Sequence, residues 1–234
     1  IRDSLKTVMD FSFFDKVNTA KNEQTDTWFK GLDRVYNNFV YDYLYPNPAS
    51  VLAFIENHDT DRFLGEGENL DMLKQASTLL LTTRRIPQLY YGTEVMMNGV
   101  KSKSDGYVRK DFPGGWADDK ENALTPEGRT RLQNESYNFY RNLLNWRKGN
   151  DVIAKGSMKQ FMVQHGVYAY ARQYKGKTVF VLLNGTDKEV KLPLKYYAEV
   201  LKDKTQGKDV ISGKVTALNE ELTMAPRQSM VIEL

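Results

Sequence analysis

Apolar residues at helical spacing mark two segments in the first half of the chain. The first segment predicts a helix over about residues 26–43, because its apolar residues recur every three or four positions; they are Trp28, Leu32, Val35, Tyr36, Phe39 and Val40. The second segment repeats this spacing from Leu70 to Leu80. Apolar runs over 50–55 and 87–91 flank it and predict strands. The order strand, helix, strand predicts a parallel pair.

A stretch without periodicity follows. Residues 95–124 are rich in Gly, Asp, Lys and Asn, which predicts a long loop. Thr125, a good cap, and Pro126, suited to the first helical position, then predict the start of a helix. We expect this helix to end near Lys148–Asn150.

Past Asp151 the chain turns to short strand-like runs. Gly-containing turns at 165–166, 175–176 and 184–185 separate them, which predicts a series of antiparallel hairpins. The runs lie at 158–163, 167–174, 178–183 and 229–234. We therefore predict an α/β domain over residues 1–151, followed by an all-β domain, a small antiparallel β-sandwich, over residues 152–234.

Composition narrows the classes of function. The 33 Lys and Arg residues nearly balance the 30 Asp and Glu residues and are mixed along the chain, so no basic stripe for nucleic acid is expected. The absence of cysteine excludes disulfides and thiolate catalysis, and two histidines argue against an ordinary zinc site.

No apolar run approaches the ~20 residues that span a bilayer. Cytosol and periplasm are both compatible with this composition. Since the chain begins at Ile1, we expect it to start within a longer protein, so a missing signal peptide carries no information.

Polar chemistry gathers where the apolar run over 50–55 ends. Four candidate site residues follow it closely, with amide, imidazole, carboxylate and guanidinium groups: Asn57, His58, Asp59 and Arg62. In barrels of parallel strands the carboxyl ends of the strands carry the catalytic groups. The structural alternatives are that Asp59 caps the next helix, or that Arg62 only pairs with Asp59 or Asp61 in solvent. Glu56 interrupts the strand and faces either the site or a partner charge.

The hexapeptide Phe54–Asp59 resembles the fourth signature region of the α-amylase superfamily, the retaining α-glucan hydrolases built on a (β/α)8 TIM barrel. Ile86–Glu94 is similar to the eighth barrel strand of that family. Arg109–Trp116 is similar to the following loop in its neopullulanase and cyclomaltodextrinase members, and Val8–Asp15 to its sixth strand and turn. The resemblance implies that residues 1–151 form the C-terminal part of the catalytic barrel and residues 152–234 the C-terminal β-sandwich.

The same resemblance implies roles for individual residues. Asp59 would be the carboxylate that stabilises the transition state, and His58 would donate to the same sugar. The nucleophile and the acid of a retaining glycosidase sit on the fourth and fifth strands in this family, ahead of this chain, so we expect the isolated chain to be inactive. Arg109–Asp111 has the first three letters of the nucleophile motif but continues into a Gly-rich loop.

Three aromatic residues lie on the predicted loop: Tyr107, Phe112 and Trp116. Sugars stack on aromatic rings, so Tyr107 and Trp116 join Asn57, His58 and Arg62 as predicted substrate-binding residues. The alternative is that Phe112 and Trp116 only anchor the loop by packing. Glu94 is either a cap or a group that orients the site. We expect no cofactor; calcium is compatible but not indicated, since the turn at 103–106 is typical of turns without a ligand.

Three functions remain open. The first is part of a retaining hydrolase of α-1,4 links in maltooligosaccharides, cyclodextrins or pullulan. The others are a non-catalytic starch-binding protein and an amylase-like scaffold. The His58–Asp59 pair favours the first, because a scaffold has no physical need for a carboxylate there. A partial barrel exposes an unpaired strand edge, so besides an α-glucan we expect the missing N-terminal part of the barrel, or a second copy, as a partner.

Overall fold

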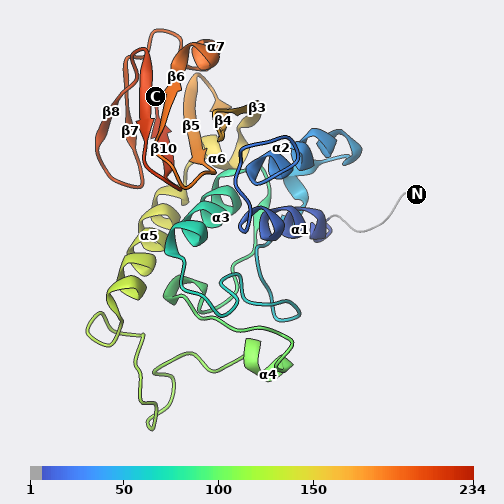
Figure 1. Cartoon of the computed structure of the whole chain (residues 1–234), viewed down its shortest axis with the longest axis vertical. Helices are drawn as coiled ribbons and strands as arrows, with labels where there is room; N and C mark the ends of the chain where they lie inside the picture. Colours follow the sequence, from blue (N-terminus) through green and yellow to red (C-terminus); the bar gives the residue numbers. More distant parts are fainter. Residues whose placement is uncertain (1–6) are drawn as a thin grey trace.

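Three extended segments of the N-terminal half lie parallel. The computed structural model describes residues 7–234 (Figure 1). Met9 forms a parallel bridge with Leu52 of β1 (Leu52–Ala53), and β1 pairs in parallel with β2 (Ile86–Pro87). Helices connect the segments: α1 (Phe11–Ala20) and α2 (Leu32–Val40) the first two, α3 (Leu70–Thr82) the last two. The predicted parallel pair is confirmed, although both strands are shorter than expected.

Two helices begin later than the sequence pattern suggested. α2 starts after Gly31, whose φ is 54°, because the Glu23 carboxylate accepts from the Gly31 N–H and the Thr25 hydroxyl from the Leu32 N–H. Trp28 therefore lies outside the helix. α5 (Arg131–Arg147) starts after Thr130, not Thr125, because Thr130 and Gln133 form a reciprocal capping box.

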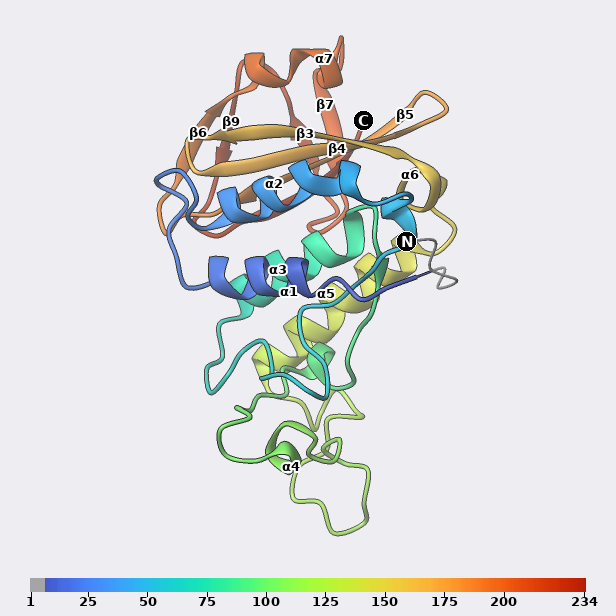
Figure 2. The ribbon, with the colours of Figure 1, turned by 90° about the vertical axis from the view of Figure 1, so that its right-hand side faces the viewer.

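The remaining helical segments are short. They are α4 (Asp105–Val108), α6 (Asp151–Lys155), α7 (Ala198–Leu201) and the 3-10 turns η1 (Tyr41–Leu44), η2 (Pro48–Ser50), η3 (Thr93–Val95) and η4 (Leu194–Tyr197). Residues 95–124 are otherwise loop and turn, as predicted. The loop and α4 extend away from the sheet, at the lower end of both views (Figures 1 and 2).

The C-terminal part is an antiparallel sheet of six strands in the order β3-β4-β5-β10-β7-β8, with a separate pair, β6 and β9. Two predicted hairpin turns are confirmed: residues 165–166 and 175–176 all have positive φ, as type I′ turns require. The third, at 184–185, is wrong, because β5 continues to β6 in the other sheet. The strands are β3 (Ser157–Gln164), β4 (Val167–Tyr174), β5 (Lys177–Asn184), β6 (Val190–Pro193), β7 (Gln206–Asp209), β8 (Val215–Ala217), β9 (Glu221–Met224) and β10 (Ser229–Glu233).

The six-stranded sheet is buried on both faces at its centre. Alternate residues of β4 point to opposite sides: Tyr168 and Tyr170 join the core of the helices, whereas Val167 and Ala169 join a second core with β6 and β9. The Tyr170 hydroxyl lies 2.6 Å from Thr82 Oγ1 of α3. One continuous core therefore links the sheet to the helical part, and α2 lies directly beneath β3 and β4 in Figure 2.

Candidate active site

The Asp59 loop, residues 57–62, follows the middle parallel segment and is braced from within. Asn57 Oδ1 accepts from the Asp59 N–H at 2.8 Å, and Thr60 Oγ1 accepts from the Asn57 N–H at 3.0 Å. The Arg62 N–H donates to the Gly99 carbonyl at 3.0 Å, which ties the end of the loop to the next connection. Asn57 is buried and serves this turn, which counts against its predicted contact with substrate.

Asp61 of the loop is exposed, and so are the neighbouring residues His58 and Asp59. The side chains of His58 and Asp59 are 62% and 59% exposed, and His58 Nε2 lies 3.2 Å from Asp59 Oδ2. Asp59 does not cap the following helix, because Asn69 does so by accepting from the Met72 N–H. The structure thus brings together the two residues for which the resemblance implied direct contact with sugar.

Two basic residues from the next connection contact Asp59, Arg109 at its carboxylate and Lys101 at its backbone carbonyl. Arg109 Nη2 lies 3.1 Å from Asp59 Oδ1, and Arg109 Nε donates to the His58 carbonyl at 2.8 Å. The same guanidinium reaches Asp105 of α4 at 3.3 Å, and Lys101 Nζ donates to the Asp59 carbonyl at 3.0 Å. No sequence pattern predicted Arg109, Lys101 or Asp105 as neighbours of Asp59. The one indication in the sequence was that Arg109 is the first residue of the segment Arg109–Trp116, which resembles the loop after the eighth strand of that family.

A buried ion pair supports the loop from beneath. Arg62 Nη1 lies 3.4 Å from Glu56 Oε1 and donates to the Tyr91 carbonyl at 2.7 Å, and the guanidinium lies 4.0 Å from the centre of the Tyr90 ring. Both charged side chains are almost fully buried. Arg62 therefore does not pair with Asp59 or Asp61 in solvent, and its burial counts against the predicted contact with substrate.

Glu56 faces this partner charge, which settles its direction. It also accepts from the Phe63 N–H and the Thr93 hydroxyl. Burial raises the pKa of Glu56, whereas the Thr93 and Phe63 hydrogen bonds and the Arg62 charge act in the opposite direction. Because several donors hold the Glu56 carboxyl in place, it stabilises the position of the Asp59 loop.

The two predicted aromatic binders lie in different surroundings. Tyr107 belongs to α4, next to the Asp59 loop through Asp105 and Arg109, and Lys110 Nζ lies 3.6 Å from the centre of its ring. Trp116 is 64% exposed and its backbone N–H donates to the Asp119 carboxylate at 3.0 Å. Within residues 7–234, the hydrogen bonds and ion pairs of Asp59 do not include Trp116. A role for Trp116 in this site stays a prediction.

Residues 7–234 contain neither a cluster of metal-binding side chains nor a helix that could span a membrane. Over residues 7–234, no group of three or more His, Cys, Asp or Glu side chains is placed to hold a metal ion. No helix in the same range is long and apolar enough to cross a membrane.

Comparison with known proteins agrees with the resemblance. The family model of the cyclo-malto-dextrinase C-terminal domain matches residues 158–233. An α-amylase of Niallia circulans is 28% identical over 225 residues, covering 93% of this chain and 39% of that protein. A cyclomaltodextrin glucanotransferase of Thermoanaerobacterium thermosulfurigenes is 32% identical over 182 residues, covering 78% of this chain and 22% of that protein. The chain thus spans well under half the length of these relatives.

Solved structures support the fold. An Anoxybacillus α-amylase superposes with a TM-score of 0.76 at 18% identity, over 98% of this chain and 47% of that one. An α-amylase of Geobacillus thermoleovorans gives the same TM-score at 19% identity, over 98% of this chain and 48% of that one. Together with the matching C-terminal domain, these relatives identify the chain as a member of the α-amylase superfamily that carries a C-terminal domain of the cyclomaltodextrinase type.

Proposed function

We propose that this chain contributes part of the active site of a retaining α-glucan hydrolase and supplies its transition-state-stabilising carboxylate, Asp59. In this proposal residues 1–151, of which 1–6 lie outside the described residues, form the C-terminal part of a (β/α)8 barrel, and residues 152–234 form a β-sandwich. The supporting observation is an exposed carboxylate held between His58 and Arg109 at the carboxyl end of a parallel strand.

The geometry suits binding to sugar hydroxyls. Each carboxylate oxygen has about two acceptor positions, so the contacts of Asp59 with His58 and Arg109 leave room for two donors from a sugar. Such hydrogen bonds tighten as the ring flattens toward an oxocarbenium ion. Because Arg109 and the braced turn fix the carboxylate beforehand, little reorganisation is needed as the charge develops.

The nucleophile and the acid would come from residues outside this chain, so the isolated chain would not hydrolyse maltooligosaccharide. The proposed substrates are α-1,4 links in maltooligosaccharides, cyclodextrins or pullulan, as for a neopullulanase or cyclomaltodextrinase. Support comes from the names of the relatives, an α-amylase and a cyclomaltodextrin glucanotransferase, and from the matched C-terminal domain.

The test is Asp59→Asn in a longer polypeptide that adds the preceding barrel strands. We expect kcat on maltooligosaccharide to fall by about a hundredfold or more with little change in KM, since the lost interaction is made in the transition state. Asp118→Asn, the same chemical change on an exposed residue of the long loop, is the control. Near-normal turnover of Asp59→Asn would refute the proposal.

We also propose that the edge of the parallel strands binds the N-terminal part of the barrel, or a second copy when that part is missing. Three apolar side chains, Val8, Met9 and Phe11, are 47%, 41% and 54% exposed beside this edge. Among the described residues the segment pairs with β1 on one side only, and open edges favour pairing with another chain. Light scattering of the isolated chain should give a species larger than a monomer; a folded, strict monomer would contradict self-association.

A further inference from the structure

A cavity of about 660 Å³, here called the junction cavity, lies where the turns of the sheet meet the connection between α1 and α2. Its walls come from three segments, residues 24–28, 162–166 and 186–190, together with Asp33. This volume falls within the range of sites for small ligands. The cavity shares no residue with the Asp59 loop, and α4, which contacts Arg109, lies at the opposite end of the molecule from the sheet (Figures 1 and 2).

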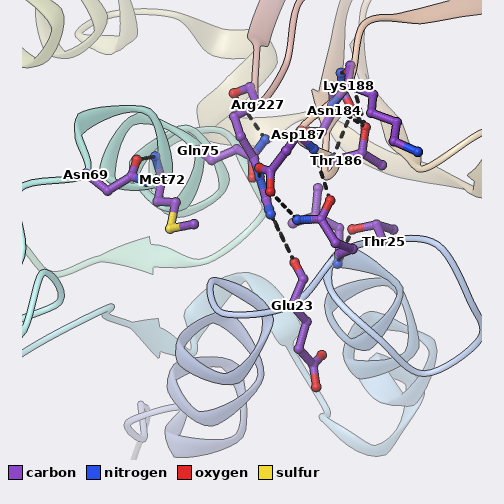
Figure 3. A network of polar contacts seen from close by, with 12 residues as sticks. Glu23, Thr25, Asn69, Met72, Gln75, Asn184, Thr186, Asp187, Lys188 and Arg227 are labelled. Atoms are coloured by element: carbon purple, nitrogen blue, oxygen red, sulfur yellow. Dashed lines mark hydrogen bonds and ion pairs between the residues drawn. The ribbon is translucent and has the colours of Figure 1, made fainter.

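The walls of the junction cavity are tied together by polar contacts (Figure 3). Gln24 and Asp187 exchange two hydrogen bonds, one of them from the Asp187 N–H at 3.0 Å. Arg227 donates to Asp187 Oδ1 at 2.6 Å and to the Glu23 carbonyl at 3.3 Å. The Thr25 N–H donates to the Gly185 carbonyl at 3.0 Å. Segments far apart in the sequence are thus locked in place, so a ligand would enter a largely preformed site.

The lining combines one large aromatic side chain with short polar groups. Trp28 is 72% exposed, and Met162, another lining residue, is 49% exposed. Four lining residues carry a carboxylate and one carries an ammonium group: Asp26, Asp33, Asp187, Glu189 and Lys188. The carboxylates outnumber the cations even when Arg227, which pairs with Asp187, is included, so the charge opposes an anionic ligand such as a phosphate. An indole face with carboxylate and hydroxyl acceptors around it suits a neutral, polyhydroxylated ligand, whose C–H faces stack while its hydroxyls donate.

We infer that the junction cavity is a second carbohydrate site, which binds a neutral oligosaccharide separately from the Asp59 loop. The choice of an α-1,4-glucan as its ligand rests on the proposed function. A second site would keep a polymeric glucan attached and raise its effective concentration near the protein. Trp28 is the central contact, and Asp26 and Glu189 accept hydroxyl donors.

The test is isothermal titration of the 234-residue chain with maltoheptaose. Trp28→Ala should raise Kd by about tenfold, the value of one stacking contact. Asp26→Asn should raise Kd by about threefold, as expected for one weakened hydrogen bond. Tyr43→Ala is the matched control, because Tyr43 is 76% exposed but does not line the cavity. The Kd of this variant for maltoheptaose should stay within about twofold of that of the unchanged chain. Because both aromatic side chains are exposed, circular dichroism and Tm should be unchanged.

Several outcomes would overturn the inference. These are no heat of binding, equal Kd for Trp28→Ala and Tyr43→Ala, tighter binding of cellohexaose than of maltoheptaose, or a dimer that Trp28→Ala dissociates. Loss of binding in Asp59→Asn with binding kept in Trp28→Ala would assign the sugar to the Asp59 loop instead. Failure of the proposed function would be seen separately, as normal turnover of Asp59→Asn. That result would not change the comparison of Kd between Trp28→Ala and Tyr43→Ala.

Discussion

The centre of the antiparallel sheet and the Asp59 loop are held in different ways. In the sheet, β4 pairs on both sides and six of its eight residues are buried, so apolar packing fixes it. The Asp59 loop keeps its functional side chains exposed and rests on a buried pair, Glu56 and Arg62. An exposed carboxylate is thus positioned by a polar network beneath it, whereas the sheet is held by shape and burial.

The largest effect on stability is expected where that polar support is broken. Glu56→Ala should lower the free energy of unfolding by about 3–5 kcal/mol, because it leaves the Arg62 charge buried without its partner. Hydrogen exchange of residues 57–63 should rise more than that of β4. Uniform loss of protection in both regions would contradict the view that Glu56 acts on the loop.

A substitution in the core of the antiparallel sheet tests whether burial stabilises that region. Leu182→Ala, at a residue with 0% exposure in β5, should cost about 2–5 kcal/mol through lost burial and a residual cavity. Val215→Ala, at a residue 67% exposed in β8, should cost no more than about 0.5 kcal/mol. Urea unfolding measures both, and equal costs would show that burial does not decide stability in the sheet.

Two glycines in the hairpin turns test how closely the sheet packs against the helical part. Gly176→Ala, at φ 78° with open space around it, should cost about 1 kcal/mol from backbone conformation alone. Gly166→Ala has nearly the same φ, but its Cβ would lie 2.4 Å from Thr186 Cγ2 and 2.9 Å from the Thr25 carbonyl oxygen. Gly166→Ala should therefore lose more stability than Gly176→Ala in urea unfolding. Equal losses would mean that Thr186 and Thr25 move aside from the added Cβ at no cost.

The smallest effect concerns pH at the start of α2. The hydrogen bond from Arg34 lowers the pKa of Glu23 in the folded protein. A carboxyl with a lowered folded pKa stabilises the protein above its unfolded pKa of about 4.3, and this contribution is lost as pH falls through the folded value. The difference in stability between the unchanged chain and Glu23→Gln should thus shrink on acidification. Glu68→Gln, at an exposed residue of another loop, is the control.

The sequence predicted those parts of the fold whose apolar residues keep a period. β3, β4 and β5 alternate or run apolar next to Gly turns, β10 is a short apolar run, and α3 repeats every three or four residues. β7 was missed because it has no hydrophobic residue: its buried positions are Gly207 and Asp209. The start of α5 was misplaced because Thr125 and Thr130 are equally good caps, and the partner Gln133 decides between them.

The candidate site was predicted only where its residues are contiguous. His58 and Asp59 stand in one motif, and the structure places them side by side. Arg109 lies 50 positions from Asp59 and Lys101 lies 42 positions away. Their approach depends on how the connection after β2 folds back, which no local pattern encodes. Burial likewise separated Arg62 from its exposed neighbours, although all belong to the same stretch of sequence.

The role proposed for Asp59 requires that it bind the flattened, positively charged sugar more tightly than the ground-state sugar. The most direct measurement is the affinity of the longer, active polypeptide for a cationic glucose analogue with a flat ring, before and after Asp59→Asn. We expect Kd for this analogue to rise by about as large a factor as kcat falls, while KM for maltooligosaccharide changes little. An unchanged Kd for the analogue, or an equal loss of ground-state binding, would contradict the role proposed for Asp59.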